Sequence, residues 1–271
     1  MNTSNKDINR IDRCFAELKA ANKKALITFV TAGDPDLETT EKIVLEMFDR
    51  GADIIELGVP FSDPIAEGVT IQKASLRSLN NGTTLDKIFD TVKNIRTKTD
   101  KPLLLMMYLN TIFVYGTEKF FSLCREYGID GVIVPDMPYE ERDEILPYAD
   151  KYGIHNINLV SPASHDRIKK IAADSSGFLY CVSSNGVTGT RSGFSTDFDE
   201  FFGLIRDNAS CPYCVGFGIS GAQQARDMAS YCDGVIVGSA IVNIIAENGK
   251  ACVNKVGAFV QELKEEISDS I

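Results

Sequence analysis

Short, almost continuously apolar segments alternate with amphipathic segments along most of the chain. The apolar segments have the length and composition of strands that are buried on both faces. There are eight: Ala25–Val30, Asp53–Leu57, Leu103–Tyr108, Gly131–Pro135, His155–Val160, Phe178–Val182, Tyr213–Phe217 and Gly234–Val237. Their regular separation by helical segments indicates a parallel sheet in which each helix crosses over to the next strand.

The amphipathic segments have the spacing of helices that cover such a sheet. The predicted helices are Leu37–Arg50, Thr84–Lys98, Thr117–Tyr127, Glu140–Tyr152, His165–Ala173, Asp197–Asp207, Ala222–Tyr231, Ala240–Ile245 and Val253–Ile267. Glycines 51, 128 and 153 follow three of them, as is typical of helix C-caps. A further helix, Ile8–Ala20, precedes the first strand and is expected to cover the bottom of the sheet structure.

Eight such strand–helix units close naturally into a barrel. The alternative is an open doubly wound sheet, which usually carries G-x-G-x-x-G after its first strand. Here the first strand runs into Thr31-Ala32-Gly33-Asp34-Pro35, which lacks that pattern. We therefore predict an α/β fold, a (β/α)8 TIM barrel with an extra N-terminal helix. No linker or low-complexity segment divides the chain, so we expect one domain over residues 1–271.

Charge and cysteine content narrow the class of protein. A formal net charge of −10 argues against nucleic acid or an anionic membrane as the main partner. No apolar run is long enough to span a membrane, and the polar N-terminus lacks the features of a secretory signal. Seven cysteines, an odd number, indicate free thiols in a reducing compartment, and hence a cytoplasmic location.

Glu56 is a carboxylate inside the second apolar segment, Asp53–Leu57. It lies in the C-terminal half of that strand, beneath the loops that carry the active sites of barrel enzymes. Burial there would raise its pKa and suit it to proton transfer near neutral pH. The pattern also leaves open a structural role, with the carboxylate bonded to a backbone amide or a neighbouring helix.

Two loops on the same side of the predicted barrel are unusually long. The loop after the second strand, residues 58–68, contains Asp63 and Glu67. Asp63 precedes a proline, as is typical of a turn, and a loop glutamate such as Glu67 is usually solvated. The loop after the sixth strand, residues 183–193, is rich in glycine and serine.

Glycine clusters follow the sixth, seventh and eighth strands, where barrels typically bind phosphate. They are Gly186-Val187-Thr188-Gly189, Gly216-Phe217-Gly218-Ile219-Ser220-Gly221 and Gly238-Ser239-Ala240. Glycine lets the backbone approach an anion closely, and helix N-termini supply free N–H groups. The sequence therefore predicts a small phosphorylated substrate that is held by backbone amides.

No pattern of side chains indicates a metal or a cofactor. The two histidines, His155 and His165, are not part of an acidic cluster. Cys211-Pro212-Tyr213-Cys214 has C-x-x-C spacing, but it precedes the seventh strand, away from the predicted site, and lacks a second ligand pair. No lysine is predicted at the C-terminal end of a strand, so a Schiff-base mechanism has no obvious nucleophile. We expect acid–base chemistry that uses neither a metal nor a cofactor.

Five segments resemble, in order, the motifs of the tryptophan synthase α subunit family. They are Thr28-Phe29-Val30-Thr31-Ala32-Gly33-Asp34-Pro35, Glu56-Leu57-Gly58-Val59-Pro60-Phe61-Ser62-Asp63-Pro64, Gly186-Val187-Thr188-Gly189, Gly216-Phe217-Gly218-Ile219-Ser220 and Gly238-Ser239-Ala240-Ile241-Val242. The resemblance extends from about Phe15 to Phe259, nearly the whole chain. The segment from Glu56 to Pro64 is highly specific to that family.

The resemblance implies a carbon–carbon lyase that cleaves indole-3-glycerol phosphate to indole and glyceraldehyde 3-phosphate in a retro-aldol step. By matched position, Glu56 is the carboxylate that protonates indole C3 and handles the glycerol hydroxyl, and Glu67 faces the indole N–H. Most family members carry Asp where this chain has Glu67. The other implied site residues line the pocket (Phe29, Tyr108, Tyr180 and Thr188) or hold the phosphate (Gly189, Gly218, Gly238 and Ser239).

The resemblance also implies a partner, a β subunit that carries pyridoxal phosphate and receives indole in an αββα complex. The loop after the second strand, the region near Asn110 and the loop after the sixth strand would face it. Two alternatives stay open. The chain could be a barrel that still binds the β subunit but catalyses the reaction slowly because Glu67 replaces Asp. It could also be another phosphosugar barrel enzyme, such as an isomerase that uses two carboxylates.

Overall fold

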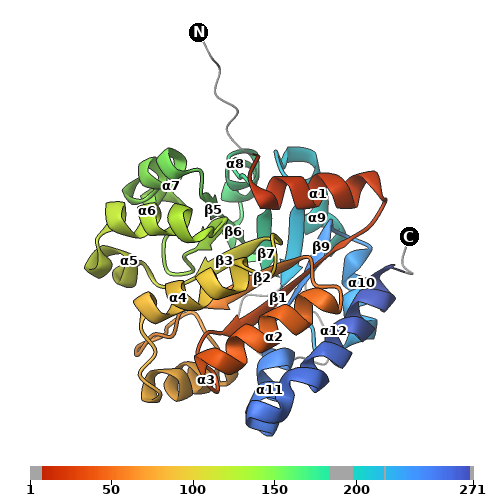
Figure 1. Cartoon of the computed structure of the whole chain (residues 1–271). Coiled ribbons are helices and arrows are strands. Elements are labelled where there is room, and N and C mark those ends of the chain that lie inside the picture. The colour runs from red at the N-terminus through yellow and green to blue at the C-terminus, as the bar shows by residue number, and fades with distance from the viewer. Residues whose placement is uncertain (1–7, 183–197, 217, 269–271) are drawn as a thin grey trace.

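The strands of the computed structural model run parallel and are surrounded by helices (Figure 1). The structure describes residues 8–182, 198–216 and 218–268. Its strands are β1 Ala25–Thr31, β2 Ile54–Gly58, β3 Leu103–Met106, β4 Gly131–Ile133, β5 His155–Ile157, β6 Leu159–Val160, β7 Leu179–Val182, β8 Tyr213–Gly216 and β9 Gly234–Val237. They lie in the order β5-β4-β3-β2-β1-β9-β8-β7-β6.

The two ends of this order, β5 and β6, are the halves of one predicted strand, His155–Val160. A single residue, Asn158, separates them. The first half pairs with β4 and the second half pairs with β7, so the ring of strands closes through this segment. The predicted eight-stranded (β/α)8 barrel is confirmed, with one strand broken in the middle.

The helices agree with the sequence pattern at most positions. They are α1 Arg10–Ala20, α2 Leu37–Asp49, α3 Val69–Asn80, α4 Leu85–Arg96, α5 Leu109–Tyr115, α6 Thr117–Tyr127, η1 Tyr139–Glu144, α7 Leu146–Tyr152, η2 Pro162–Ser164, α8 Arg167–Ala173, α9 Phe198–Asn208, α10 Ala222–Ala229, α11 Ser239–Asn248, η3 Gly249–Cys252 and α12 Val253–Ser268. The sequence pattern did not predict α3 and α5. Moreover, the helix predicted over Glu140–Tyr152 is divided into η1 and α7.

The inside of the barrel and α1 form one apolar cluster. Ile11 and Phe15 of α1 are buried, and the Phe15 ring lies 5.9 Å from that of Phe178. The side chain of Asn9, the N-cap of α1, donates to the carbonyl oxygens of Asp130 and Gly153, each of which lies just before a strand. The predicted position of the extra helix at the N-terminal end of the barrel is therefore confirmed, and that end is closed.

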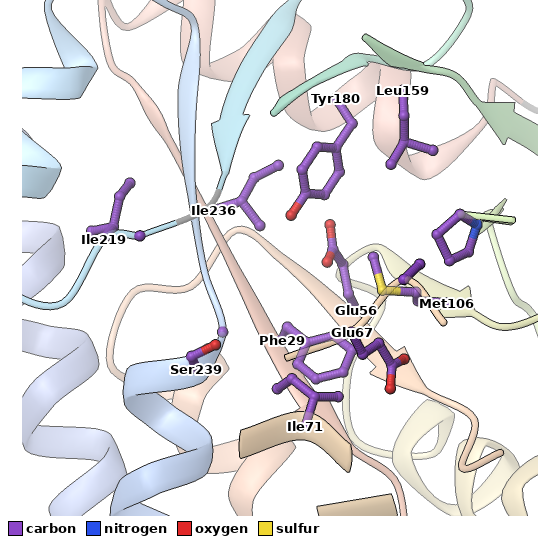
Figure 2. Close-up of a pocket in the computed structure, with 14 residues that line it drawn as sticks. Phe29, Glu56, Glu67, Ile71, Met106, Leu159, Tyr180, Ile219, Ile236 and Ser239 are labelled. Atoms are coloured by element: carbon purple, nitrogen blue, oxygen red, sulfur yellow. The ribbon is translucent and has the colours of Figure 1, made fainter. Parts of the chain in front are cut away.

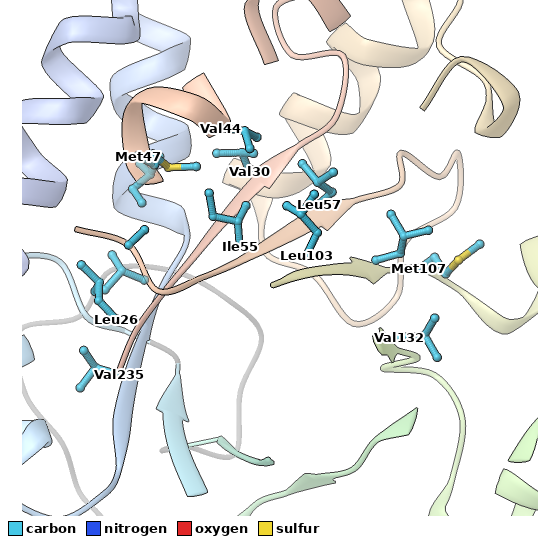
Figure 3. Close-up of a cluster of buried hydrophobic side chains, with 14 of the residues drawn as sticks. Leu26, Val30, Val44, Met47, Ile55, Leu57, Leu103, Met107, Val132 and Val235 are labelled. Atoms are coloured by element: carbon cyan, nitrogen blue, oxygen red, sulfur yellow. The ribbon is translucent and has the colours of Figure 1, made fainter. Parts of the chain in front are cut away.

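A second and larger apolar cluster lies between the strands and the outer helices. Figure 3 shows part of it, with side chains of β1, β2 and β3 lying beside residues of α2. The labelled residues are Leu26, Val30, Val44, Met47, Ile55, Leu57, Leu103, Met107, Val132 and Val235. Because alternate residues of each strand face this layer, the intervening residues, such as Glu56, point into the barrel.

Side-chain bonds hold α3 against the loop that follows β1. The guanidinium of Arg77 donates two hydrogen bonds of 2.7 Å to the carboxylate of buried Asp34. The hydroxyl of Ser78 donates to the carbonyl oxygen of Ala32 at 2.6 Å. This fixes α3, and with it the residues just before α3, over the mouth of the barrel. Among the described residues, no helix combines the length and apolarity needed to cross a membrane.

Replacing Phe15 with alanine should destabilise the protein strongly, because the change leaves a cavity between α1 and the barrel interior. We expect Phe15→Ala to lower the free energy of unfolding by about 3–5 kcal/mol. Urea denaturation of the isolated chain measures the effect. Phe113→Ala is the matched control, since the Phe113 ring is exposed and should contribute less than about 1 kcal/mol. Equal losses in the two variants would contradict a structural role for α1.

Candidate active site

A cavity of about 680 Å³ lies at the C-terminal ends of the strands, where the sequence places the site. Figure 2 shows its walls, which are mainly apolar. The lining residues are Phe29, Glu56, Ala66, Glu67, Ile71, Met106, Pro135, Leu159, Tyr180, Gly218, Ile219, Ile236, Gly238 and Ser239. In the described part of the chain this lining contains two acidic side chains and no lysine or arginine.

Glu56 is fully buried in β2 and lines the cavity. Within the described residues, neither of its carboxyl oxygens has a hydrogen-bond partner. The alternative of a structural carboxylate bonded to a backbone amide is therefore not observed. Burial raises the pKa of Glu56 from 4.5 to about 8, so at neutral pH most of this group is protonated and can act as an acid.

Glu67 lines the same cavity from the loop just before α3. Its Oε2 atom is buried and has no hydrogen-bond partner in the described structure. Burial raises its pKa to about 7. The local pattern favours a solvated glutamate at this position. That prediction is wrong, because the loop folds inward here. In Figure 2 the carboxyl groups of Glu56 and Glu67 point in different directions, so they can contact different parts of one ligand.

Two aromatic rings fit into the cavity because glycines stand beside them. A Cβ atom at Gly58 would lie 2.5 Å from the Phe29 ring, and one at Gly216 would lie 2.4 Å from the Tyr180 hydroxyl. Figure 2 shows that the Tyr180 hydroxyl faces the Glu56 carboxyl. Burial, and then the nearby Glu56, hold the pKa of Tyr180 well above its usual value, so this hydroxyl keeps its proton. Phe29 and Tyr180 thus both line the cavity.

Tyr108 has a different position from the one expected, because it is not part of the cavity lining. Its hydroxyl accepts a hydrogen bond from the backbone N–H of Ala66 at 3.0 Å. Its ring stacks on that of Phe61, with the ring centres 4.8 Å apart. Tyr108 therefore holds the loop that carries Glu67.

The predicted anion site is partly described. Gly238 is the N-cap of α11, and Ser239 begins the helix. No side chain in the described structure caps this end, and the first N–H groups of a helix have no acceptor within it. Gly218, with a φ of +82°, contributes backbone atoms to the cavity lining from the segment after β8. These three residues line the cavity, whereas Thr188 and Gly189 lie outside the described residues.

The apolar walls include residues that the sequence analysis did not single out. Met106, Leu159 and Ile236 are inward-facing residues near the ends of strands, so strand alternation could have identified them. Ile71 could not be found in this way, because it belongs to α3, a helix that the pattern did not predict. Together these residues make an apolar slot, with acids at two positions and free backbone N–H groups at a third.

The two acids suit different tasks. Burial raises the pKa of Glu56 to about 8 and that of Glu67 to about 7, so both groups titrate close to neutral pH and Glu67 loses its proton first as the pH rises. One can then accept a hydrogen bond while the other donates a proton. No group of three or more His, Cys, Asp or Glu side chains within the described ranges is arranged to hold a metal ion.

The buried Glu56 should make stability depend on pH. Its pKa is raised on folding, so its contribution to stability is complete below about pH 4.5 and is lost as the pH rises through about 8. We expect the free energy of unfolding of the wild type to fall relative to Glu56→Gln across this range, by about 1.4 kcal/mol per pH unit. Urea denaturation of both proteins at several pH values measures the difference. A difference that does not change with pH would contradict the raised pKa.

The family described as tryptophan synthase alpha chain matches residues 15–268 of this chain. Tryptophan synthase alpha chains from Caldanaerobacter subterraneus subsp. tengcongensis and Clostridium kluyveri are 50% and 48% identical to this chain. The two alignments cover 95% and 96% of this chain, and 99% and 100% of those relatives.

Solved structures show the same similarity. The tryptophan synthase alpha subunit of Legionella pneumophila superposes with a TM-score of 0.87 at 34% identity, covering 97% of this chain and 99% of that one. A chain of the Pyrococcus furiosus tryptophan synthase complex superposes with a TM-score of 0.81 at 35% identity, covering 89% of this chain and 98% of that one. The family resemblance read from the motifs is confirmed. The chain belongs to the tryptophan synthase alpha chain family.

Proposed function

We propose that the cavity cleaves indole-3-glycerol phosphate to indole and glyceraldehyde 3-phosphate, with Glu56 as the proton donor. The observation that supports this most strongly is a pair of acids, fully buried Glu56 and partly buried Glu67, in one apolar cavity that ends at uncapped helix N–H groups. The apolar walls match an indole ring, and the N–H groups match a phosphate. Membership of the alpha chain family sets aside the isomerase alternative.

The reaction needs a proton on C3 of the indole ring before the carbon–carbon bond can break. Glu56 in its protonated form donates this proton, which removes the aromaticity of the five-membered ring and places positive charge on the ring nitrogen. Glu67 in its ionised form accepts a hydrogen bond from the ring N–H and stabilises that charge.

Bond cleavage then restores the proton to Glu56. The glycerol hydroxyl next to the breaking bond gives its proton to the Glu56 carboxylate, and its oxygen forms the aldehyde carbonyl. The electron pair of the carbon–carbon bond returns to the ring and restores indole. One proton thus moves from the hydroxyl to C3, and Glu56 ends as it began, with no added acid or base consumed.

The phosphate would be held by backbone amides at Gly218, Gly238 and Ser239. The positive end of the α11 dipole favours an anion there. By the family resemblance, Thr188 and Gly189 complete the pocket from the loop after β7. Holding the phosphate at one end fixes the ring between the two acids, and correct placement of reacting groups is itself a large part of catalysis.

A β subunit is the proposed partner, and it would cover the side of the barrel mouth formed by the loop after β2, α3 and α5. Large apolar side chains are exposed there: Ile65, Val69, Leu76, Phe113 and Val114. A patch of this kind is typical of an interaction surface. These residues include members of the loop after β2 and lie close in sequence to Asn110, two regions that the resemblance implies would face the partner. The P. furiosus relative is described as part of a tryptophan synthase complex.

A cytoplasmic location is part of the proposal. All seven cysteines are free thiols, which is the usual state in a reducing compartment.

Glu56→Gln should abolish turnover while leaving the fold intact, because glutamine has the shape of glutamic acid but cannot donate the proton. We expect kcat to fall by at least about 10²-fold, the usual size of general acid catalysis. The assay follows indole release with saturating β subunit, and circular dichroism checks the fold. Retention of more than a few per cent of the wild-type rate would rule out Glu56 as the acid.

Glu67→Asp should keep or raise the rate, because Asp is the residue that most of the family carries and it keeps the carboxylate. The same indole assay measures it, with Glu67→Gln as a control that keeps the length but loses the charge and should be slow. A complete loss of activity in Glu67→Asp would show that the loop has been rebuilt around glutamate. A low wild-type rate that Glu67→Asp greatly raises would favour the alternative of a catalytically weakened partner of β.

Val114→Asp should weaken binding of the β subunit, because the Val114 side chain is 80% exposed in the apolar patch and a charge there must be desolvated on docking. We expect the Kd, measured by calorimetry, to rise at least about tenfold. Ile8→Asp is the matched control, since Ile8 is 72% exposed next to α1 at the opposite end of the barrel. Equal effects of the two changes would place the interface elsewhere.

A further inference from the structure

A second cavity, of about 920 Å³, lies behind one wall of the catalytic cavity. It is formed by the segment after β4, by η1, by the broken strand β5–β6 and by α8. Pro135 and Leu159 line both cavities. Residues that line the second cavity and not the catalytic one include Val134, Asp136, Met137, Arg142, Asn156, Arg167 and Ile171.

The second cavity contains a buried hydrogen-bond acceptor that is not used. Asn156 of β5 is only 5% exposed, and its Oδ1 atom has no hydrogen-bond partner in the described part of the chain. Its neighbour Asn158 differs, because its amide donates to the hydroxyl of Ser175 at 3.1 Å. An unpartnered buried acceptor is costly and rare in folded proteins. A ligand N–H or O–H group would satisfy the one on Asn156.

Side chains of opposite charge line the same cavity. The Asp136 carboxylate accepts one hydrogen bond through Oδ1, from the backbone N–H of Leu109 at 3.0 Å. Arg142 and Arg167 also line it, and each forms an ion pair, with Asp174 at 3.0 Å and with Glu140 at 3.3 Å. A guanidinium has five N–H donors, so one ion pair leaves donors for a further acid group. One carboxylate and two guanidinium groups thus line the same cavity, and they are complementary to the ammonium and carboxylate groups of a zwitterion.

The remaining wall is apolar, formed in part by Val134, Met137 and Ile171. The lining therefore has acceptors for an ammonium group, donors for a carboxylate, an apolar surface and one buried acceptor for a side-chain N–H. We propose that this cavity is a second binding site, for an aromatic α-amino acid whose side chain carries an N–H group. L-tryptophan has this chemistry, and choosing it as the probe rests on the proposed function.

Occupancy of this site acts on catalysis through the shared wall. Pro135 and Leu159 present one side to each cavity, and Leu159 lies just after the break in the barrel strand. A ligand that orders this wall changes the shape of the slot that holds the indole ring. The proposed site thus gives the enzyme a way to respond to an amino acid without contact between that amino acid and Glu56 or Glu67.

Calorimetric titration of the full chain with L-tryptophan and with L-phenylalanine tests the proposal. We expect one L-tryptophan per chain, with L-phenylalanine binding about tenfold more weakly because it lacks the N–H that Asn156 accepts. In Asn156→Leu, L-tryptophan binding should weaken about tenfold and the preference over L-phenylalanine should disappear. Without amino acid, Asn156→Leu should cleave substrate at the wild-type rate, whereas inhibition or activation by L-tryptophan should be lost.

Asp136→Asn is the second variant, because it keeps the bond to Leu109 and removes the charge that an ammonium group would meet. It should weaken both amino acids equally and keep the preference between them. Absence of L-tryptophan binding to the wild type would overturn the proposal. A preference for L-tryptophan over L-phenylalanine that persists in Asn156→Leu would overturn it as well. Competition with substrate that neither variant alters would place L-tryptophan in the catalytic cavity and also overturn it. Binding is measured without turnover, so failure of the lyase reaction would not be mistaken for failure of this site.

Discussion

The burial of one unbonded carboxyl group, that of Glu56, is the constraint on which the site depends. A carboxylate without partners is expensive in an apolar interior, so the group stays protonated at neutral pH. The barrel makes this possible by closing its N-terminal end with α1 and surrounding β2 with apolar side chains. The unbonded carboxyl group lowers the stability of the folded protein, but it provides a proton donor that lines the cavity.

The position of the second acid, Glu67, depends on contacts between residues that are far apart in the sequence. Glu67 reaches the cavity because Tyr108 bonds the backbone of Ala66, and because the bidentate pair of Arg77 with Asp34 holds α3 in place. These contacts join three strand–helix units of the barrel. Burial raises the pKa of both acids, and Glu67, which is less buried than Glu56, loses its proton first as the pH rises.

The sequence was sufficient for features that follow from local periodicity. Strand and helix alternation predicted the barrel, and the position of Glu56 in the C-terminal half of the second strand made it a candidate without excluding a structural role. Glu67 could not be placed in this way, because its burial depends on Tyr108, which is distant in the sequence, and on α3, a helix that the pattern did not predict. The interruption of the fifth predicted strand at Asn158 also escaped the pattern, and so did the cavity behind it, because that cavity is lined by residues of several elements that are far apart in the sequence.

The protonation state of Glu56 in the free enzyme is the most direct test of this account. Infrared difference spectra between wild type and Glu56→Gln, recorded as a function of pH, report the carbonyl band of a protonated carboxyl group at this position. The account predicts that the band is present at pH 6 and titrates away near pH 8. A Glu56 that is already ionised at pH 6 would contradict it, because the group could not then deliver a proton to the indole ring.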